Sequence, residues 1–182
     1  MTNVIPINPL KLKHIIISLF ITFVLALPTY SPAGQFKVTM VYDGDTIKAE
    51  GHDIVIYVLL AGLDAPEICL RENKKAQPYG REAKEYLENL ILNKIVEVKG
   101  HGLGPYPYSN LVGEIFLEDR NINIDMIKKG FAEVYSEKLP EGLDITLYGE
   151  AEKEAKEAKR GVWSLKENYI SPKAWRETHR DK

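Results

Sequence analysis

Apolar residues are grouped in five short runs from residue 35 onward, each rich in Val, Ile, Tyr or Thr. Asp-Gly and Gly-His-Asp, which are turn-forming sequences, separate the first three runs and so predict a three-stranded meander. Residues 101–110, between the last two runs, are rich in glycine and proline, which predicts a loop without regular structure. The predicted strands are 35–42, 46–50, 54–60, 95–99 and 111–117.

Helical patterns cover three longer segments. Residues 81–92 repeat apolar residues at the spacing of an amphipathic helix, residues 123–129 are closed by Gly130, and residues 144–160 are closed by Gly161. Five strands with a helix between the third and the fourth is the order of an OB-fold, a small closed barrel that commonly binds nucleic acids or oligosaccharides. The sequence therefore predicts an α+β fold, mostly β, with a five-stranded OB-fold barrel and three helices.

The N-terminus has the composition of an export signal. Lys11 and Lys13 precede the apolar run 15–27, and Ser31-Pro32-Ala33 offers small residues for cleavage. The run is shorter than the roughly 20 residues that span a bilayer, so an uncleaved membrane anchor is the less favoured alternative. We predict a signal peptide over 1–33, a barrel domain over 34–165 and a C-terminal tail over 166–182. The protein would then be exported to a periplasmic or extracellular location.

The charge balance argues against a protein that grips duplex DNA through a basic face. The chain carries 24 Lys and Arg against 26 Asp and Glu, a net charge of −2. Basic residues gather only in the tail, at Lys173, Arg176 and beyond, and we interpret that segment as a solvated, frayed helix end. His52 and His101 are expected in turns that face solvent. The single cysteine, Cys69, forms no internal disulfide and is interpreted as a small buried hydrophobe.

Acidic residues gather around the end of the third predicted strand. Asp45 follows the Asp43-Gly44 turn, and Asp64 and Glu67 follow the apolar strand. Converging carboxylates suggest a hard metal ion such as calcium, whereas chemistry on phosphate esters normally uses cationic side chains beside the metal. No lysine or arginine occurs between Lys48 and Arg71. Asp43 itself is expected to bond backbone within the turn.

These segments occur in the order of a known family. The chain resembles the staphylococcal nuclease (thermonuclease) family over about residues 36–165, and the resemblance implies an OB-fold that cleaves DNA and RNA with calcium. The motifs that carry it are VYDGDT at 41–46, AGLDAPE at 61–67, QPYGREA at 77–83, the stretch from Asn123 through GFA at 130–132, and AKRGVWS at 158–164.

The resemblance also implies roles for individual residues. Asp45 and Asp64 correspond to the carboxylates that hold calcium, with the carbonyl of Ala65 beside them. Glu67 corresponds to the residue that holds or deprotonates the attacking water. Tyr108 and Tyr135 lie where the family contacts its substrate, and base stacking on tyrosine would give a weak grip on single-stranded DNA or RNA. Packing of Tyr135 into the barrel rim is an equal alternative.

Two departures from the family pattern concern its arginines. Leu59 and Asn110 stand where the family has phosphate-gripping guanidinium groups. A cation on a transferring phosphoryl group is worth on the order of 10³ to 10⁵ in rate, so hydrolysis is expected to be weakened. A basic group from the loop 71–75, or Arg81, is a conceivable replacement, but we interpret that loop as solvated.

Three functions therefore stay open at this point. The first is an exported calcium-dependent nuclease, weakened or using substitute cations. The second is a catalytically inactive module that binds nucleic acid or a protein partner. The third is a structural or adaptor domain of the cell envelope with a vestigial calcium site. No small-molecule cofactor is expected, and the sequence does not predict an oligomeric state.

Overall fold

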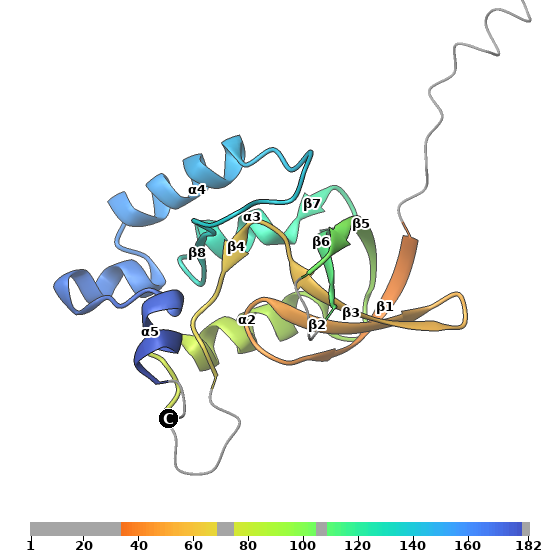
Figure 1. The fold of residues 1–182 in the computed structure, drawn as a ribbon, viewed down its shortest axis with the longest axis horizontal. Coiled ribbons are helices and arrows are strands. Elements are labelled where there is room, and N and C mark those ends of the chain that lie inside the picture. The colour runs from red at the N-terminus through yellow and green to blue at the C-terminus, as the bar shows by residue number, and fades with distance from the viewer. Residues whose placement is uncertain (1–33, 69–74, 105–108, 180–182) are drawn as a thin grey trace, which may run out of the picture. The chain divides into compact units, whose positions relative to one another are not determined.

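Five strands close into a barrel in the computed structural model, which describes residues 34–68, 75–104 and 109–179 (Figure 1). All the described residues belong to one compact unit. The predicted signal peptide, Cys69 and Tyr108 lie outside them. The barrel strands are β1 (Gly34–Val41), β2 (Thr46–Gly51), β3 (Ile54–Leu60), β5 (Ile95–Leu103) and β6 (Leu111–Leu117).

The barrel closes through a parallel pair between β3 and β6, in which Val58 lies opposite Leu111 and Leu60 opposite Gly113. The strand order in the barrel is β3-β2-β1-β5-β6, and all neighbouring strands in this order pair antiparallel. The two-residue strand β7 (Arg120–Asn121) extends the sheet beyond β6. The predicted α+β fold with a five-stranded OB-type barrel is therefore confirmed.

One predicted loop boundary is wrong. Strand β5 continues to Leu103, so His101 lies in a strand and not in a turn. A register shift between Gly100 and Leu103 allows the strand to pass its glycines and still pair with Leu111. The His101 side chain is only 6% exposed and bonds Glu114, which contradicts the expectation that it faces solvent.

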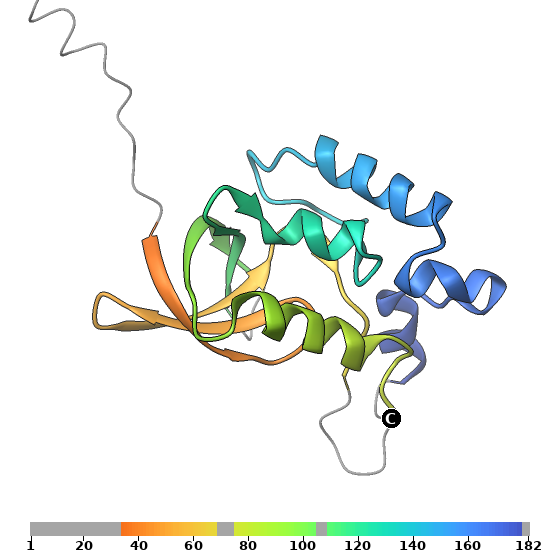
Figure 2. The same cartoon turned by 180° about the vertical axis from the view of Figure 1, so that it is seen from behind.

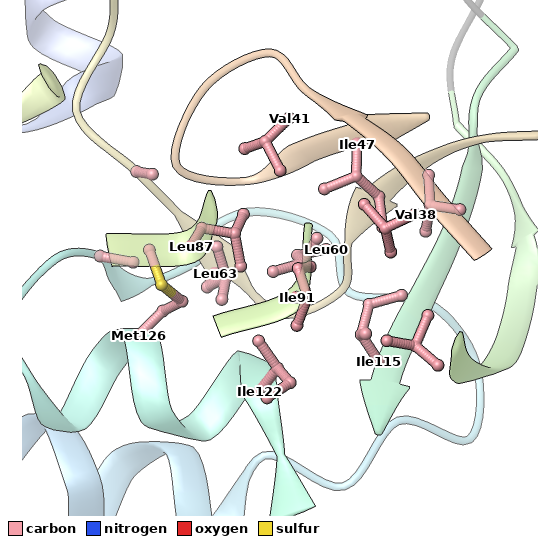
Figure 3. Close-up of a cluster of buried hydrophobic side chains, with 14 of the residues drawn as sticks. Val38, Val41, Ile47, Leu60, Leu63, Leu87, Ile91, Ile115, Ile122 and Met126 are labelled. Carbon is pink, nitrogen blue, oxygen red and sulfur yellow. The ribbon is translucent and has the colours of Figure 1, made fainter. Parts of the chain in front are cut away.

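The core fills the barrel and the space between the barrel and two helices. In β2 and in the first part of β1, alternate residues point inward, as the two-residue period of a strand requires. Figure 3 shows strand residues meeting Leu87 and Ile91 of α2 (Gly80–Ile91) and Ile122 and Met126 of α3 (Ile122–Lys128). The largest fully buried side chains are Tyr148, Ile47, Leu60, Leu87, Ile91, Ile115, Ile122, Met126, Ile127, Val38, Val58 and Val96.

A buried asparagine joins α3 to the barrel. Asn123 accepts from the backbone N–H of Ile115 at 2.9 Å and donates to the carbonyls of Ala61 at 2.9 Å and Gly113 at 3.2 Å. Asn121 caps the same helix by accepting from Ile124 N–H. The helix α4 (Thr146–Glu157) packs beside α3 (Figure 2). The three predicted helices are therefore present.

Two further elements follow α4, where the sequence analysis predicted a C-terminal tail that ends in a frayed helix. The 3₁₀ segment η1 (Gly161–Asn168) leads to the helix α5 (Pro172–Thr178), which begins at Ser171, whose hydroxyl accepts from Ala174 N–H. In both whole-chain views α5 lies beside the start of α2 (Figures 1 and 2). Within the described residues, every helix is too short or too polar to cross a bilayer.

Candidate functional site

The turn between β1 and β2 places Asp45 against the segment that follows β4 (Leu63–Asp64). Asp43 accepts from Asp45 N–H at 3.0 Å, which is the turn role expected of it. The Asp45 carboxylate accepts from Ala65 N–H at 2.9 Å and from the Thr46 hydroxyl at 3.0 Å. A Cβ at Gly44 would lie 2.7 Å from the Ala65 Cβ, so only glycine lets the turn approach this closely.

Asp64 is fixed by a second, smaller sheet. Strand β4 pairs with β8 (Glu133–Val134), with Asp64 opposite Glu133. Tyr135 N–H donates to the carbonyl of Gly62 at 3.0 Å and extends this connection. These pairings hold the short strand β4 in place. Asp64, the last residue of that strand, is only 6% exposed.

Glu67 is positioned by Gln77, a buried residue from the segment before α2. Gln77 donates its backbone N–H to the Glu67 carbonyl at 3.0 Å, and its side-chain oxygen accepts from Glu67 N–H at 3.0 Å. The first residue of α2, Gly80, lies so close that a Cβ there would be 2.5 Å from the Glu67 carbonyl oxygen. The family-like motif that begins at Gln77 thus holds the backbone of the acidic segment.

Arg176 of α5 joins the two acidic side chains. Its Nη1 donates to Asp64 Oδ1 at 2.8 Å and to Glu67 Oε1 at 2.7 Å, and its Nη2 donates to Asp64 Oδ2 at 2.8 Å. The interpretation of the basic tail as a solvated, frayed helix end is therefore wrong for this residue. A cation does reach the acidic cluster, but it comes from the C-terminal helix.

The segment considered for a replacement cation does not provide one among the residues that the structure describes. Lys75 and Arg81 are both exposed, and neither forms an ion pair with Asp45, Asp64 or Glu67. Residues 71–74 of that loop lie outside the described residues. The guanidinium of Arg176 is thus the only cationic group within 4 Å of these carboxylates in the described chain.

The electrostatics of the cluster follow from burial and crowding of like charges. Burial, together with the Asp43 charge, raises the pKa of Asp45 well above its ordinary value. Burial also raises the pKa of Glu67, although the bond from Arg176 acts in the opposite direction. Hydrogen bonds to Asp64, followed by those to Glu67, raise the pKa of Arg176, which stays charged. Negative charge at Asp45 is therefore costly unless a cation lies near it.

The oxygen donors of this cluster fit a hard divalent cation such as calcium. Asp45, Asp64 and the Ala65 carbonyl supply only oxygen, which is the ligand atom calcium prefers. The hydrogen-bond donors to Asp45 are neutral groups, so no cationic side chain of the described chain neutralises its charge. Across the three described segments, no group of three His, Cys, Asp or Glu side chains converges as a ready-made metal cluster. The assignment of Asp45, Asp64 and the Ala65 carbonyl to calcium therefore stays a prediction.

The remaining predicted site residues lie on three separate segments of the chain. Tyr135 donates its hydroxyl to Glu137 at 2.9 Å, and Glu137 in turn pairs with Lys173 of α5 at 2.6 Å. Leu59 is half-buried in β3, opposite Thr46 of β2. Asn110 precedes β6, and its carbonyl accepts from Gly104 N–H at 2.8 Å.

Sequence reasoning missed two residues of this site, Gln77 and Arg176. Gln77 was visible as the first residue of a motif, but its bond to the carbonyl of Ile170 at 2.8 Å depends on where the tail lies. Arg176 is one of several basic residues near the C-terminus, and nothing in their spacing separates it from its neighbours.

Comparison with known proteins places these elements in one family. A sequence model of the family described as "Staphylococcal nuclease homologue" matches residues 57–165. The chain is 33% identical over 131 residues to a protein from Pyricularia oryzae named "Probable endonuclease LCL3", a match that covers 68% of this chain and 49% of that protein. A protein of the same name from Komagataella phaffii is 35% identical over 116 residues, covering 60% of this chain and 50% of its own.

A bacterial relative matches over a longer stretch. The protein from Haemophilus influenzae named "Uncharacterized endonuclease" is 28% identical over 166 residues, and the match covers 90% of this chain and 85% of that protein. By contrast, the chain spans about half the length of the fungal relatives it matches.

Proposed function

The chain belongs to the family of staphylococcal nuclease homologues, and from that premise we propose that it hydrolyses phosphodiester bonds of nucleic acid, with calcium as its metal. The observation that carries this proposal is the junction of Asp45 with Ala65, which brings the half-buried carboxylate of the β1–β2 turn to the acidic segment containing Asp64 and Glu67. The relatives named as endonucleases support the reaction class.

The roles of the protein groups follow from their surroundings. Asp45, Asp64 and the carbonyl of Ala65 would hold the ion, which when bound polarises a phosphoryl oxygen and stabilises the charge that develops on it. Glu67 would hold the attacking water and accept its proton, for which a raised pKa is suitable because it makes the carboxylate a stronger base. Gln77 keeps Glu67 in place by binding both the backbone N–H and the carbonyl of Glu67.

We propose that this activity is weaker than in a family member with two arginines at the positions of Leu59 and Asn110. Leu59 has no polar side-chain group and the Asn110 amide carries no positive charge, so neither side chain offers a cation to a phosphate oxygen. Single-stranded DNA or RNA is the proposed substrate, with Tyr135 as a contact at the rim. Export through the N-terminal segment also stays a proposal, and it would place the reaction in a calcium-rich compartment.

The direct test is cleavage of denatured DNA and of RNA by the full chain in millimolar calcium. We expect hydrolysis that disappears when calcium is chelated and that falls at least about a hundredfold in Glu67→Gln, as for loss of a general base. Circular dichroism of the variant checks that the barrel is retained. Equal product formation by the wild type and Glu67→Gln would contradict the proposal, because contaminating nuclease would explain it.

A second candidate function is a non-catalytic module that binds nucleic acid or a protein. The observation that favours it is that both oxygens of Asp64 are already bonded to Arg176. This alternative predicts saturable, salt-sensitive binding of single strands with no turnover in calcium. Calcium-dependent cleavage by the wild type would exclude it.

A further inference from the structure

We infer that Arg176 is the phosphate-gripping cation of this protein, in place of the guanidinium groups that positions 59 and 110 lack. This inference rests on the proposed function for the class of its substrate, a phosphodiester of nucleic acid. It assigns a substrate contact to a helix that follows the family-matched segment 57–165.

The geometry leaves part of the guanidinium available for a substrate. Arginine has five N–H donors, and three of them are used by Asp64 and Glu67. Nε and the second hydrogen of Nη2 have no acceptor within hydrogen-bond distance in the described chain. These two donors lie on adjacent nitrogens, the pair that forms a fork toward two oxygens of one phosphate.

The guanidinium also lies at the boundary between the protein and solvent. The Arg176 side chain is 41% exposed, whereas the Asp64 side chain beneath it is 7% exposed. The buried carboxylate therefore orients the cation from below, and its outer edge is open to an incoming phosphate. Exposure to solvent weakens the contribution of an ion pair to stability, so stability alone does not account for a partly exposed guanidinium at this position.

The helix that carries Arg176 is held on the site by several independent contacts. Gln77 Nε2 donates to the carbonyl of Ile170 at 2.8 Å, immediately before the helix cap at Ser171. One turn before Arg176, Lys173 pairs with Glu137, and that glutamate also accepts from Tyr135. Because Gln77 also binds Glu67, one buried side chain fixes the acid and the helix relative to each other. The guanidinium is therefore preorganised rather than loosely placed.

The test separates phosphate binding from turnover. Binding of fluorescein-labelled oligothymidylate is measured by anisotropy in the Glu67→Gln background, in calcium and again in chelator, over a range of salt concentrations. Arg176→Gln is expected to weaken binding by about tenfold and to lower the slope of log K against log salt by about 0.7, the value for one phosphate contact on a single strand. Arg176→Lys keeps the charge and is expected to recover most of the affinity.

Lys153→Gln is the matched control, since it removes one exposed cation from α4 and leaves Asp64, Glu67 and the contacts of α5 untouched. It is expected to change the affinity by less than about twofold, as for a rim charge distant from the phosphate. Fluorescence of Trp175 and circular dichroism verify that each variant keeps α5 folded.

The outcomes distinguish this inference from the proposed function. If Arg176→Gln loses affinity while the wild type cleaves nothing, hydrolysis is wrong and the phosphate contact stands. If the wild type cleaves and Arg176→Gln binds and cleaves as well as or better than it, the phosphate contact is wrong and Arg176 is a latch on Asp64. Absence of any binding in the Glu67→Gln background, with the fold intact, also overturns the inference.

Discussion

Arg176 and Asp64, which are separated by 112 residues, meet through two parallel hydrogen bonds of 2.8 Å each. This fork is the strongest geometry available to an arginine and a carboxylate. It ties the last described helix to the rim of the barrel, where Asp64 ends the short strand β4. The C-terminal helix is thus part of the candidate site and not an appendage to it.

Gln77 is the residue whose removal should release that helix. Gln77→Leu leaves Glu67 N–H and the carbonyl of Ile170 without partners, and we expect a loss of about 1–3 kcal/mol in the free energy of unfolding. Urea unfolding measures the loss, and amide hydrogen exchange should become faster over residues 172–178.

Gln35→Leu, which replaces an exposed glutamine of β1, is the matched control and should leave exchange in α5 unchanged. Unaltered exchange in α5 of Gln77→Leu would show that the other contacts of the tail suffice to hold it.

Glu114 should make stability depend on pH below neutrality. Burial opposes its ionisation, yet hydrogen bonds from Lys99 and His101 hold the pKa of Glu114 below its ordinary value. The folded state therefore binds a proton less readily than the unfolded chain, so the stability from this group is present above the unfolded pKa of about 4.5 and is lost as pH falls through the lower, folded pKa.

We expect Glu114→Gln to lower the free energy of unfolding by about 1–3 kcal/mol at pH 7, because the buried His101 and the more exposed Lys99 lose a charged acceptor. The difference in the free energy of unfolding between Glu114→Gln and the wild type, measured with urea, should shrink as pH falls below about 4.5. Glu50→Gln is the control, since Glu50 pairs with Lys48 in an exposed setting and should show a much smaller difference. A difference that is constant from pH 7 to pH 3 would show that the charge of Glu114 contributes nothing.

Gly130 and Gly161 form a backbone contact that no other residue can make. Both have positive φ, 75° and 50°, and Val162 N–H donates to the Gly130 carbonyl at 2.9 Å. A Cβ at Gly130 would overlap the backbone of Arg160. We expect Gly130→Ala to destabilise the protein by about 1–3 kcal/mol through strain, measured by thermal unfolding.

Gly149 provides the opposite case in α4. Its surroundings leave space for a Cβ, with nothing within 4 Å. Gly149→Ala is therefore expected to stabilise the protein by up to about 1 kcal/mol, the difference in helix propensity. Equal effects of the two substitutions would contradict the close approach at Gly130.

Introducing arginine at the two positions that depart from the family pattern should raise the rate of hydrolysis. Leu59 is half-buried in β3 and Asn110 lies just before β6, and these strands pair in parallel near both residues. We expect Leu59→Arg with Asn110→Arg to raise kcat/KM on denatured DNA by at least about a hundredfold, since each cation stabilises charge on the phosphoryl group.

Leu59→Gln with Asn110→Gln controls for the loss of apolar packing without adding charge. Its kcat/KM should not exceed that of the wild type. A folded arginine double variant with unchanged kcat/KM would show that the rim does not present these positions to the scissile phosphate.

The local order of the chain was sufficient to predict the barrel. Turn sequences and apolar runs specify strands through short-range preferences, and the closing β3–β6 pair follows from the strand order of the OB-fold. The positions of Asp45 and Ala65 were predicted as one site from a motif, and their hydrogen bond places them side by side. The strands follow from local preferences, whereas Asp45 and Ala65, 20 residues apart, were assigned to one site through the resemblance to the family.

The origin of the cation and the path of the tail were decided by the tertiary structure alone. Arg176 and Lys173 are both basic and lie on the same short helix. Arg176 nevertheless binds the buried Asp64, whereas Lys173 binds an exposed glutamate. Likewise, His101 lies in a segment rich in glycine but is buried against Glu114, because β5 continues past its register shift. The partner that each of these side chains binds depends on how elements distant in sequence pack together. Local conformational preferences do not determine that packing.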